Sequence, residues 1–365
     1  MPLQNIRVLD LTRLLPGPFA TMVLADFGAE VIKIEDPFLG DYARDFGPLI
    51  NGEGAMFQSL NRNKTSITLN LKEEKDRQTF LNLVKEADVV VESFRPGVME
   101  RLGLDYEKLK RENESLIYCA ITGYGQTGPF KEKPGHDLNF IGYSGLLQLM
   151  GRSDQPPVIP ATTIADIGGG AQPAIIGILL ALFHRERTGE GQFVDISMLD
   201  GVLSWLQTLL PGYLNGAEEP QRAEQMLDGG VAYYYIYETK DSRYLAVGAV
   251  EEKFWKIFCE KIGRPDLIDK QFQPKHVQEK MKSEIQTIIK TRTLQEWTEL
   301  FEPLDACVTP ILSFSEVKEH PQILAREMIL PVTDDKGNTF THIGPAIKLS
   351  KTPAQIKSLA PNRKP

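Results

Sequence analysis

The chain has 365 residues, of which 42% are hydrophobic and 25% charged, as in a globular protein with room for two domains. Its formal net charge of −8 argues against nucleic acid as a partner of the whole molecule. The three cysteines, Cys119, Cys259 and Cys307, show no CxxC spacing and predict no metal site, so we expect reduced thiols in a cytoplasmic protein. No secretory signal pattern opens the sequence, and the longest apolar run, residues 174–183, is short of the ~20 residues of a membrane span. We therefore expect no membrane insertion.

Apolar strand patterns alternate with helical patterns in the first half of the chain. The expected strands are residues 6–11, 31–35, 66–71, 87–92 and 116–121, and the expected helices are residues 19–27, 73–86 and 106–113. This alternation predicts an α/β fold with a Rossmann-like parallel sheet and helices on both faces. The first turn, Leu15-Pro16-Gly17-Pro18, lacks the GxGxxG phosphate fingerprint, so NAD or FAD is not expected there.

The second half of the chain predicts a smaller α+β domain. We expect a large domain over residues 1–197, a linker helix and crossover over 198–225, the small domain over 226–315 and a return linker over 316–329. Residues 330–365 are expected to complete the large domain. The expected elements are a long helix from Asp166 to about residue 187, a strand at 192–196, a helix at 198–210, strands at 231–238, 243–250 and 339–348, and helices at 252–262, 277–290 and 294–303.

A glycine-rich stretch over residues 121–170 carries the candidate chemistry. His136 and Asp137 follow a glycine-rich turn, and Asp166 precedes the run Gly168 to Gly170 at the start of the long helix. Free N–H groups at a helix start suit a developing oxyanion, so the N–H of Asp166, together with the helix behind Gly168, is the candidate donor group. The alternatives are a surface or capping His-Asp pair, an N-cap role for Asp166, and glycines that serve only close helix packing.

Several motifs in this order carry a family resemblance. They are Gly123-Tyr124-Gly125-Gln126-Thr127-Gly128-Pro129, Gly135-His136-Asp137, Asp166 before its glycines, Met226-Leu227-Asp228-Gly229-Gly230 and Asp305-Ala306-Cys307-Val308-Thr309-Pro310. From about residue 4 to about residue 350 the chain resembles the family III CoA-transferase (CaiB/BaiF) group, and within it the α-methylacyl-CoA racemases.

The resemblance implies an interlocked homodimer that takes an acyl-CoA substrate. Coenzyme A would lie on the large domain, and the active site would lie between the large domain of one subunit and the small domain of the other. Position by position, the racemase bases correspond to His136 and Asp166, and their supporting carboxylates to Asp137 and Glu251. In transferases of the group, the counterpart of Asp166 is the carboxylate that becomes acylated.

The resemblance also implies a set of coenzyme A contacts. They are Asn70, Leu71, Lys72, Arg95, Gly125, Gln126, Thr127 and Gly128. Racemase relatives often carry Arg where this chain has Asp36, so Lys33, Arg62 or Lys64 is a candidate substitute. The alternative, favoured for at least two of these three, is ordinary surface charge.

Inversion at the α-carbon explains why such residues suit a racemase. One base removes the α-proton from one face while a second, protonated group returns a proton to the other. A histidine and a carboxyl of raised pKa satisfy this near neutral pH, and no metal or organic cofactor is required, because coenzyme A is part of the substrate. The alternatives are a CoA-transferase that works through an anhydride on Asp166 and a non-catalytic acyl-CoA binding protein. Binding alone needs none of the four titratable residues, which disfavours the last.

Overall fold

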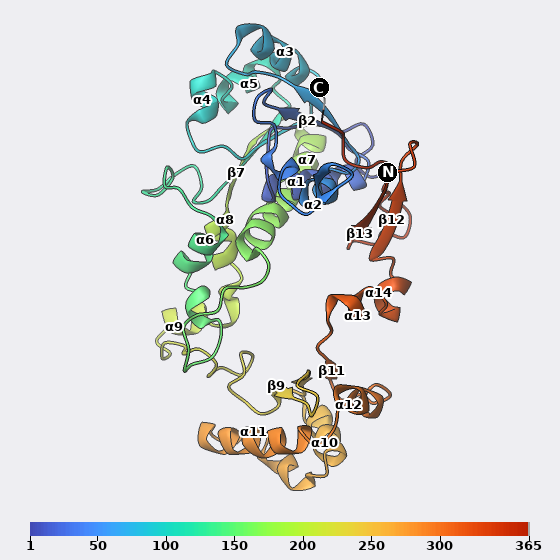
Figure 1. Cartoon of the computed structure of the whole chain (residues 1–365). Coiled ribbons are helices and arrows are strands. Elements are labelled where there is room, and N and C mark those ends of the chain that lie inside the picture. Colours follow the sequence, from blue (N-terminus) through green and yellow to red (C-terminus); the bar gives the residue numbers. More distant parts are fainter. Residues whose placement is uncertain (364–365) are drawn as a thin grey trace. The chain divides into compact units, whose positions relative to one another are not determined.

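The computed structural model describes residues 1–363, which form two compact units (Figure 1). The first unit consists of Met1–Leu146, Pro160–Leu206 and the chain from Pro321 onward. The second consists of Leu147–Ile159 and Gln207–His320. Each unit has its own sheet, so each is described separately.

A six-stranded parallel sheet forms the centre of the first unit. In the order β5-β2-β1-β6-β7-β8, its strands are Lys64–Thr68, Glu30–Glu35, Arg7–Asp10, Val89–Glu92, Ile117–Thr122 and Phe193–Ser197. Every residue of β6 and β7 is buried, as expected for central strands covered on both faces. The predicted α/β fold class is confirmed.

Helices pack on both faces of this sheet, and further helices of the unit pack around them. They are α1 (Pro16–Asp26), α2 (Ala55–Leu60), α3 (Glu74–Val84), α4 (Val98–Leu102), α5 (Tyr106–Glu112), α6 (Asp137–Tyr143), a π-helix (Ala165–Ala171), α7 (Gln172–Thr188) and α8 (Met198–Leu203). Phe80 of α3 and Leu109 of α5 pack on one face, against Leu9 and Val90. On the other face α1 and α7 contact each other, and they contact β1 and β7 respectively.

The π-helix and α7 form one continuous helical segment, Ala165–Thr188. By length and composition alone this segment could also cross a membrane, a property that core helices of water-soluble proteins share. The helix predicted over residues 198–210 is shorter in the structure, where α8 ends at Leu203. There the Ser204 hydroxyl donates to the Gly201 carbonyl at 2.7 Å, and such local bonds compete with helix continuation.

The C-terminal segment of the first unit contacts residues from early in the sequence. After α14 (Pro321–Ala325), β12 (Ile329–Thr333) and β13 (Thr339–Ile343) form an antiparallel hairpin. Arg62 donates to the Ile343 carbonyl at 2.8 Å, and the N–H of Gln355 donates to the Asp26 carbonyl at 2.9 Å. A short hairpin of β3 (Leu49–Ile50) and β4 (Glu53–Gly54) completes the unit.

The second unit packs helices on a three-stranded antiparallel sheet. Its elements are α9 (Leu210–Leu214), β9 (Tyr234–Glu238), β10 (Tyr244–Gly248), α10 (Glu252–Lys261), α11 (Lys275–Ile289), α12 (Leu294–Phe301), β11 (Val308–Pro310) and α13 (Phe314–Val317). Its core contains stacked aromatic side chains, among them Trp255, Phe258, Trp297 and Phe301.

Candidate active site

A pocket of about 610 Å³ lies at the carboxyl ends of β6 and β7 in the first unit. Residues 93–96 after β6 and Thr122–Gly123 at the end of β7 form part of its wall. In parallel sheets ligands bind at this edge, because the loops that follow the strands converge there. The pocket is therefore the first candidate for the active site.

His136 and Asp166 both line this pocket. His136 is the exposed N-cap residue of α6, and its backbone N–H donates to Oδ1 of Asn139 at 3.0 Å. Asp166 is half-buried in the first turn of the π-helix. The structure thus brings the two predicted bases to one pocket, and their catalytic roles remain predictions.

Asp137 binds the backbone at the start of the helix that carries Asp166. Its Oδ1 accepts from the N–H of Ala165 at 2.5 Å and from the N–H of Asp166 at 3.0 Å. Burial raises the pKa of the Asp166 carboxyl to about 6, and the negative charge of Asp137 adds to this rise. The Asp166 N–H, one part of the predicted oxyanion donor group, is therefore not free in this structure, because it already binds a carboxylate, which a helix N-terminus attracts.

The three glycines after Asp166 serve close helix packing, one of the two interpretations of the sequence. A Cβ on Gly168 would lie 2.0 Å from Trp205, and one on Gly169 would lie 2.5 Å from the Met198 carbonyl oxygen. From the other side, a Cβ on Gly201 of α8 would lie 2.0 Å from the Gly169 carbonyl oxygen. Because these positions are glycines, the backbone of α8 can contact the π-helix directly. This contact holds the segment that carries Asp166 in place.

Glu251 belongs to the second unit, where it is the exposed N-cap residue of α10. Its role as a supporting carboxylate stays a prediction.

The residues predicted to contact coenzyme A lie at several places in the first unit. Asn70, Leu71 and Lys72 line a separate pocket of about 260 Å³ with Arg13 and Phe94, two residues that also line the 610 Å³ pocket. Arg95 lines the 610 Å³ pocket and a third pocket of about 410 Å³, which Gln126 also lines. Gly125 (φ +80°), Thr127 and Gly128 (φ +83°) lie in the turn after β7, outside the lining of these three pockets.

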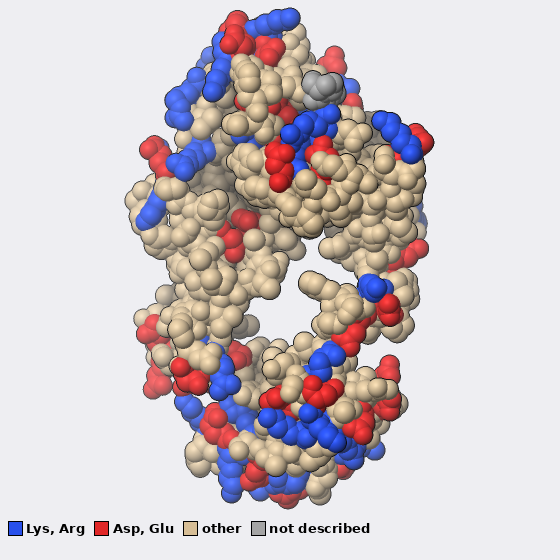
Figure 2. Space-filling view, viewed as in Figure 1, with Lys and Arg blue, Asp and Glu red and all other residues tan. Residues whose placement is uncertain are grey.

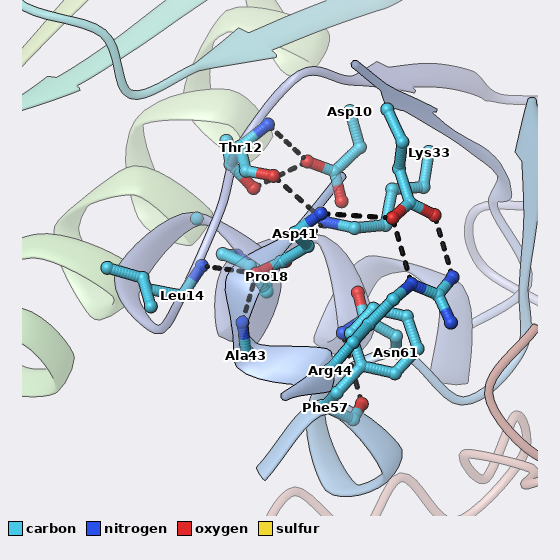
Figure 3. A network of polar contacts seen from close by, with 12 residues as sticks. Asp10, Thr12, Leu14, Pro18, Lys33, Asp41, Ala43, Arg44, Phe57 and Asn61 are labelled. Carbon is cyan, nitrogen blue, oxygen red and sulfur yellow. Dashed lines mark hydrogen bonds and ion pairs between the residues drawn. The ribbon is translucent and has the colours of Figure 1, made fainter. Parts of the chain in front are cut away.

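Lys33, Arg62 and Lys64 are not available to a phosphate group, and Figure 3 shows Lys33 and Asp41 within one network of polar contacts. All three are buried, and each forms an ion pair: Lys33 with Asp41 at 2.9 Å, Arg62 with Asp26 at 2.7 Å and Lys64 with Asp10 at 3.0 Å. Both interpretations, phosphate ligand and surface charge, are therefore wrong. Buried acidic partners, which the sequence pattern did not reveal, hold these cations inside the fold.

Asp36 faces its own loop. Its Oδ1 accepts from the N–H groups of Phe38 at 2.8 Å and Leu39 at 3.0 Å, as in an Asx turn. It also lines the 260 Å³ pocket.

Sequence reasoning missed three cationic side chains of the 610 Å³ pocket wall and one buried acid. Arg13, Lys131 and Lys133 line the pocket together with Arg95, which was predicted only as a coenzyme A contact. Arg13 follows the carboxyl end of β1, a position that could have identified it. Burial raises the pKa of Glu92, the last residue of β6, to about 8, and no local sequence signal indicates this.

Known proteins share this fold and these motifs. The CoA-transferase family III model matches residues 3–363. The human α-methylacyl-CoA racemase is 39% identical, with 88% of this chain and 80% of that protein covered. The mouse succinyl-CoA:glutarate CoA-transferase is 36% identical, with 96% and 81% covered. The crystal structure of a CAIB/BAIF family protein from Brucella suis matches with a TM-score of 0.86 and 31% identity, over 99% of this chain and 96% of that one.

Fold, pocket and relatives together define an α/β enzyme. The chain belongs to CoA-transferase family III, which confirms the resemblance drawn from its motifs.

Proposed function

We propose that the protein racemises or epimerises 2-methylacyl-CoA thioesters by α-proton abstraction and return. The observation that carries this proposal is the shared pocket of His136 and Asp166, in which burial raises the pKa of Asp166 to about 6. Near neutral pH one of the two groups accepts the α-proton and leaves an enolate-like intermediate, and the other donates a proton to the opposite face. The substrate neither gains nor loses a proton overall.

The charges of the pocket suit a coenzyme A thioester. Arg13, Arg95, Lys131 and Lys133 line it, against the single carboxylate of Asp166. The adjoining 260 Å³ pocket has apolar walls that include Leu71 and Phe94, as a nucleotide base requires. We assign the nucleotide to that pocket and the thioester to the larger one. No further cofactor enters the proposed reaction.

The proposal includes an interlocked homodimer in the cytoplasm. An apolar face of α7 supports it, since Ile176, Leu179, Leu180 and Phe183 are all exposed. In Figure 2 the drawn surface around α6 and α8 is mostly uncharged apart from one small acidic group, whereas the second unit carries many charged side chains. A second copy would cover the apolar face and supply its Glu251 to the site.

A CoA-transferase is the second candidate, favoured by the 36% identity with the mouse succinyl-CoA:glutarate CoA-transferase. In that reaction Asp166 attacks the thioester carbonyl, the coenzyme A thiolate leaves, and a mixed anhydride forms. The thiolate then attacks the Asp166 carbonyl of the anhydride, which releases the donor acid and leaves coenzyme A as a thioester on Asp166. The acceptor carboxylate attacks this thioester to form a second anhydride, and the expelled thiolate attacks the acceptor carbonyl, which gives the new acyl-CoA and frees Asp166. This chemistry needs no base opposite Asp166.

Incubation of one epimer of a 2-methylacyl-CoA in heavy water separates the two functions. A racemase inverts the epimer and places deuterium at the α-carbon without any acceptor acid. His136→Ala then abolishes inversion but leaves slow exchange on the face of Asp166. Acceptor-dependent transfer without deuterium incorporation would overturn the racemase proposal and leave the family unchanged.

A further inference from the structure

The two pockets assigned to the thioester and the nucleotide share a cationic residue, Arg13. Its guanidinium lies 6.0 Å from the ring centre of Tyr42 and 5.6 Å from that of Phe94. Within residues 1–363, its side chain forms no ion pair and no hydrogen bond, in contrast to Lys33, Arg62 and Lys64. Arg13 is thus a half-buried cation, held between aromatic rings, without an acidic partner in the described chain.

A cation without an acidic partner in a pocket wall can bind an anionic ligand, and the flanking aromatic rings favour its position. The position of Arg13 between the two pockets indicates which anion it would bind. Coenzyme A has its pyrophosphate between the 3′-phosphoadenosine and the pantetheine, and Arg13 lies where the nucleotide pocket meets the thioester pocket.

On the basis of the proposed function, we infer that Arg13 binds the pyrophosphate of coenzyme A. Asp36 cannot serve, since it is itself an anion and caps its own turn. Lys72, exposed on the wall of the nucleotide pocket, is the cation for the 3′-phosphate. A guanidinium suits the first role because it donates two parallel hydrogen bonds to phosphate oxygens.

Calorimetric titration with coenzyme A, 3′-dephospho-coenzyme A and pantetheine tests this assignment. Arg13→Gln should weaken coenzyme A and the dephospho form by the same factor, about tenfold to a hundredfold, with little change for pantetheine. Lys72→Gln should weaken coenzyme A alone. Arg13→Lys, which keeps the charge, should recover part of the loss, and Arg111→Gln, exposed on α5, is the matched control.

The outcomes also separate this inference from the proposed function. If the unaltered protein binds coenzyme A and Arg13→Gln binds it equally well, the assignment of Arg13 is wrong and the proposed function is untouched. An equal loss for pantetheine in Arg13→Gln, with an unchanged melting temperature, would mean that Arg13 only shapes the pocket. An unaltered protein that binds none of the three compounds would overturn the proposed function itself.

Discussion

Asp137 acts on Asp166 in two ways. Its hydrogen bonds hold the backbone at Asp166, and its negative charge raises the pKa of the Asp166 carboxyl. Asp137→Asn keeps the Oδ1 that accepts from Ala165 and Asp166 but removes the negative charge. The pKa of Asp166 should then fall below about 6, although burial, the larger cause, keeps it raised. If Asp166 removes the α-proton of one epimer, as proposed, kcat/KM for that epimer should decrease as pH falls through this pKa. We expect this acidic limb to move to lower pH in Asp137→Asn.

Rate profiles between pH 4.5 and 8 measure this shift. Asp137→Ala, which also loses both hydrogen bonds, should instead lower the rate at every pH. An acidic limb that stays in place in Asp137→Asn would show that Asp137 has only a structural role.

Glu92 makes the stability of the fold depend on pH. Its Oε2 accepts from the N–H of Phe94 at 2.6 Å, and burial raises its pKa from 4.5 to about 8. Between these two values the folded state holds a proton that the unfolded state releases, so the contribution of Glu92 to stability falls as pH rises. Glu92→Gln should therefore become more stable than the unaltered protein as pH increases from 5 to 8. Urea midpoints at both values test this, with the exposed Glu100→Gln as a control that shows no such trend.

Close contact between α8 and the π-helix depends on glycine. Gly201→Ala places its Cβ 2.0 Å from the Gly169 carbonyl oxygen, a backbone atom that cannot rotate away. We expect a loss of about 1–3 kcal/mol of unfolding free energy and a displaced Asp166 with lower activity. In contrast, Gly142 of α6 has no atom within 4 Å of an added Cβ. Gly142→Ala should gain about 0.5–1 kcal/mol, so equal effects in denaturant titrations of the two variants would contradict the packing argument.

The bounds of helices and strands were predictable from the sequence where the spacing of apolar residues alone determines them. The expected strand at 116–121 and β7 (Ile117–Thr122) differ by one residue at each end. The strand expected at 66–71 instead runs over Lys64–Thr68, because a buried ion pair with Asp10 brings Lys64 into the sheet. The π-helix was beyond prediction, since its i to i+5 pattern arises from packing against α8.

Tertiary contacts also limit what sequence reveals about the site. The motif identified His136 and Asp166, and both line the pocket. It could not show that the Asp166 N–H is occupied, because Asp137 reaches it only through the fold. The same holds for Arg13 and Lys33, whose ionic partners, or lack of them among residues 1–363, depend on distant side chains.

At the scale of the whole molecule, the exposed apolar face of α7 predicts that two copies of the chain associate. We expect a homodimer by sedimentation at micromolar concentration. Leu180, 63% exposed on α7, should be intolerant of Asp, because a charge would be buried when a second copy covers it. Leu180→Asp should lose the dimer and the activity together, whereas Leu324→Asp on α14 should lose neither. A fully active monomer would contradict the interlocked arrangement.

The segment after β6 borders three pockets at once. Phe94 lines the 610 and 260 Å³ pockets, and Arg95 and Pro96 line the 610 and 410 Å³ pockets. A substitution in this segment therefore changes the shape of more than one pocket, so binding in one pocket cannot be altered without affecting another. Residues 131–135 line the largest of the three pockets through Lys131, Lys133, Pro134 and Gly135, and none of these lines the other two. That loop is the part of the wall where directed evolution could alter acyl preference independently of nucleotide binding.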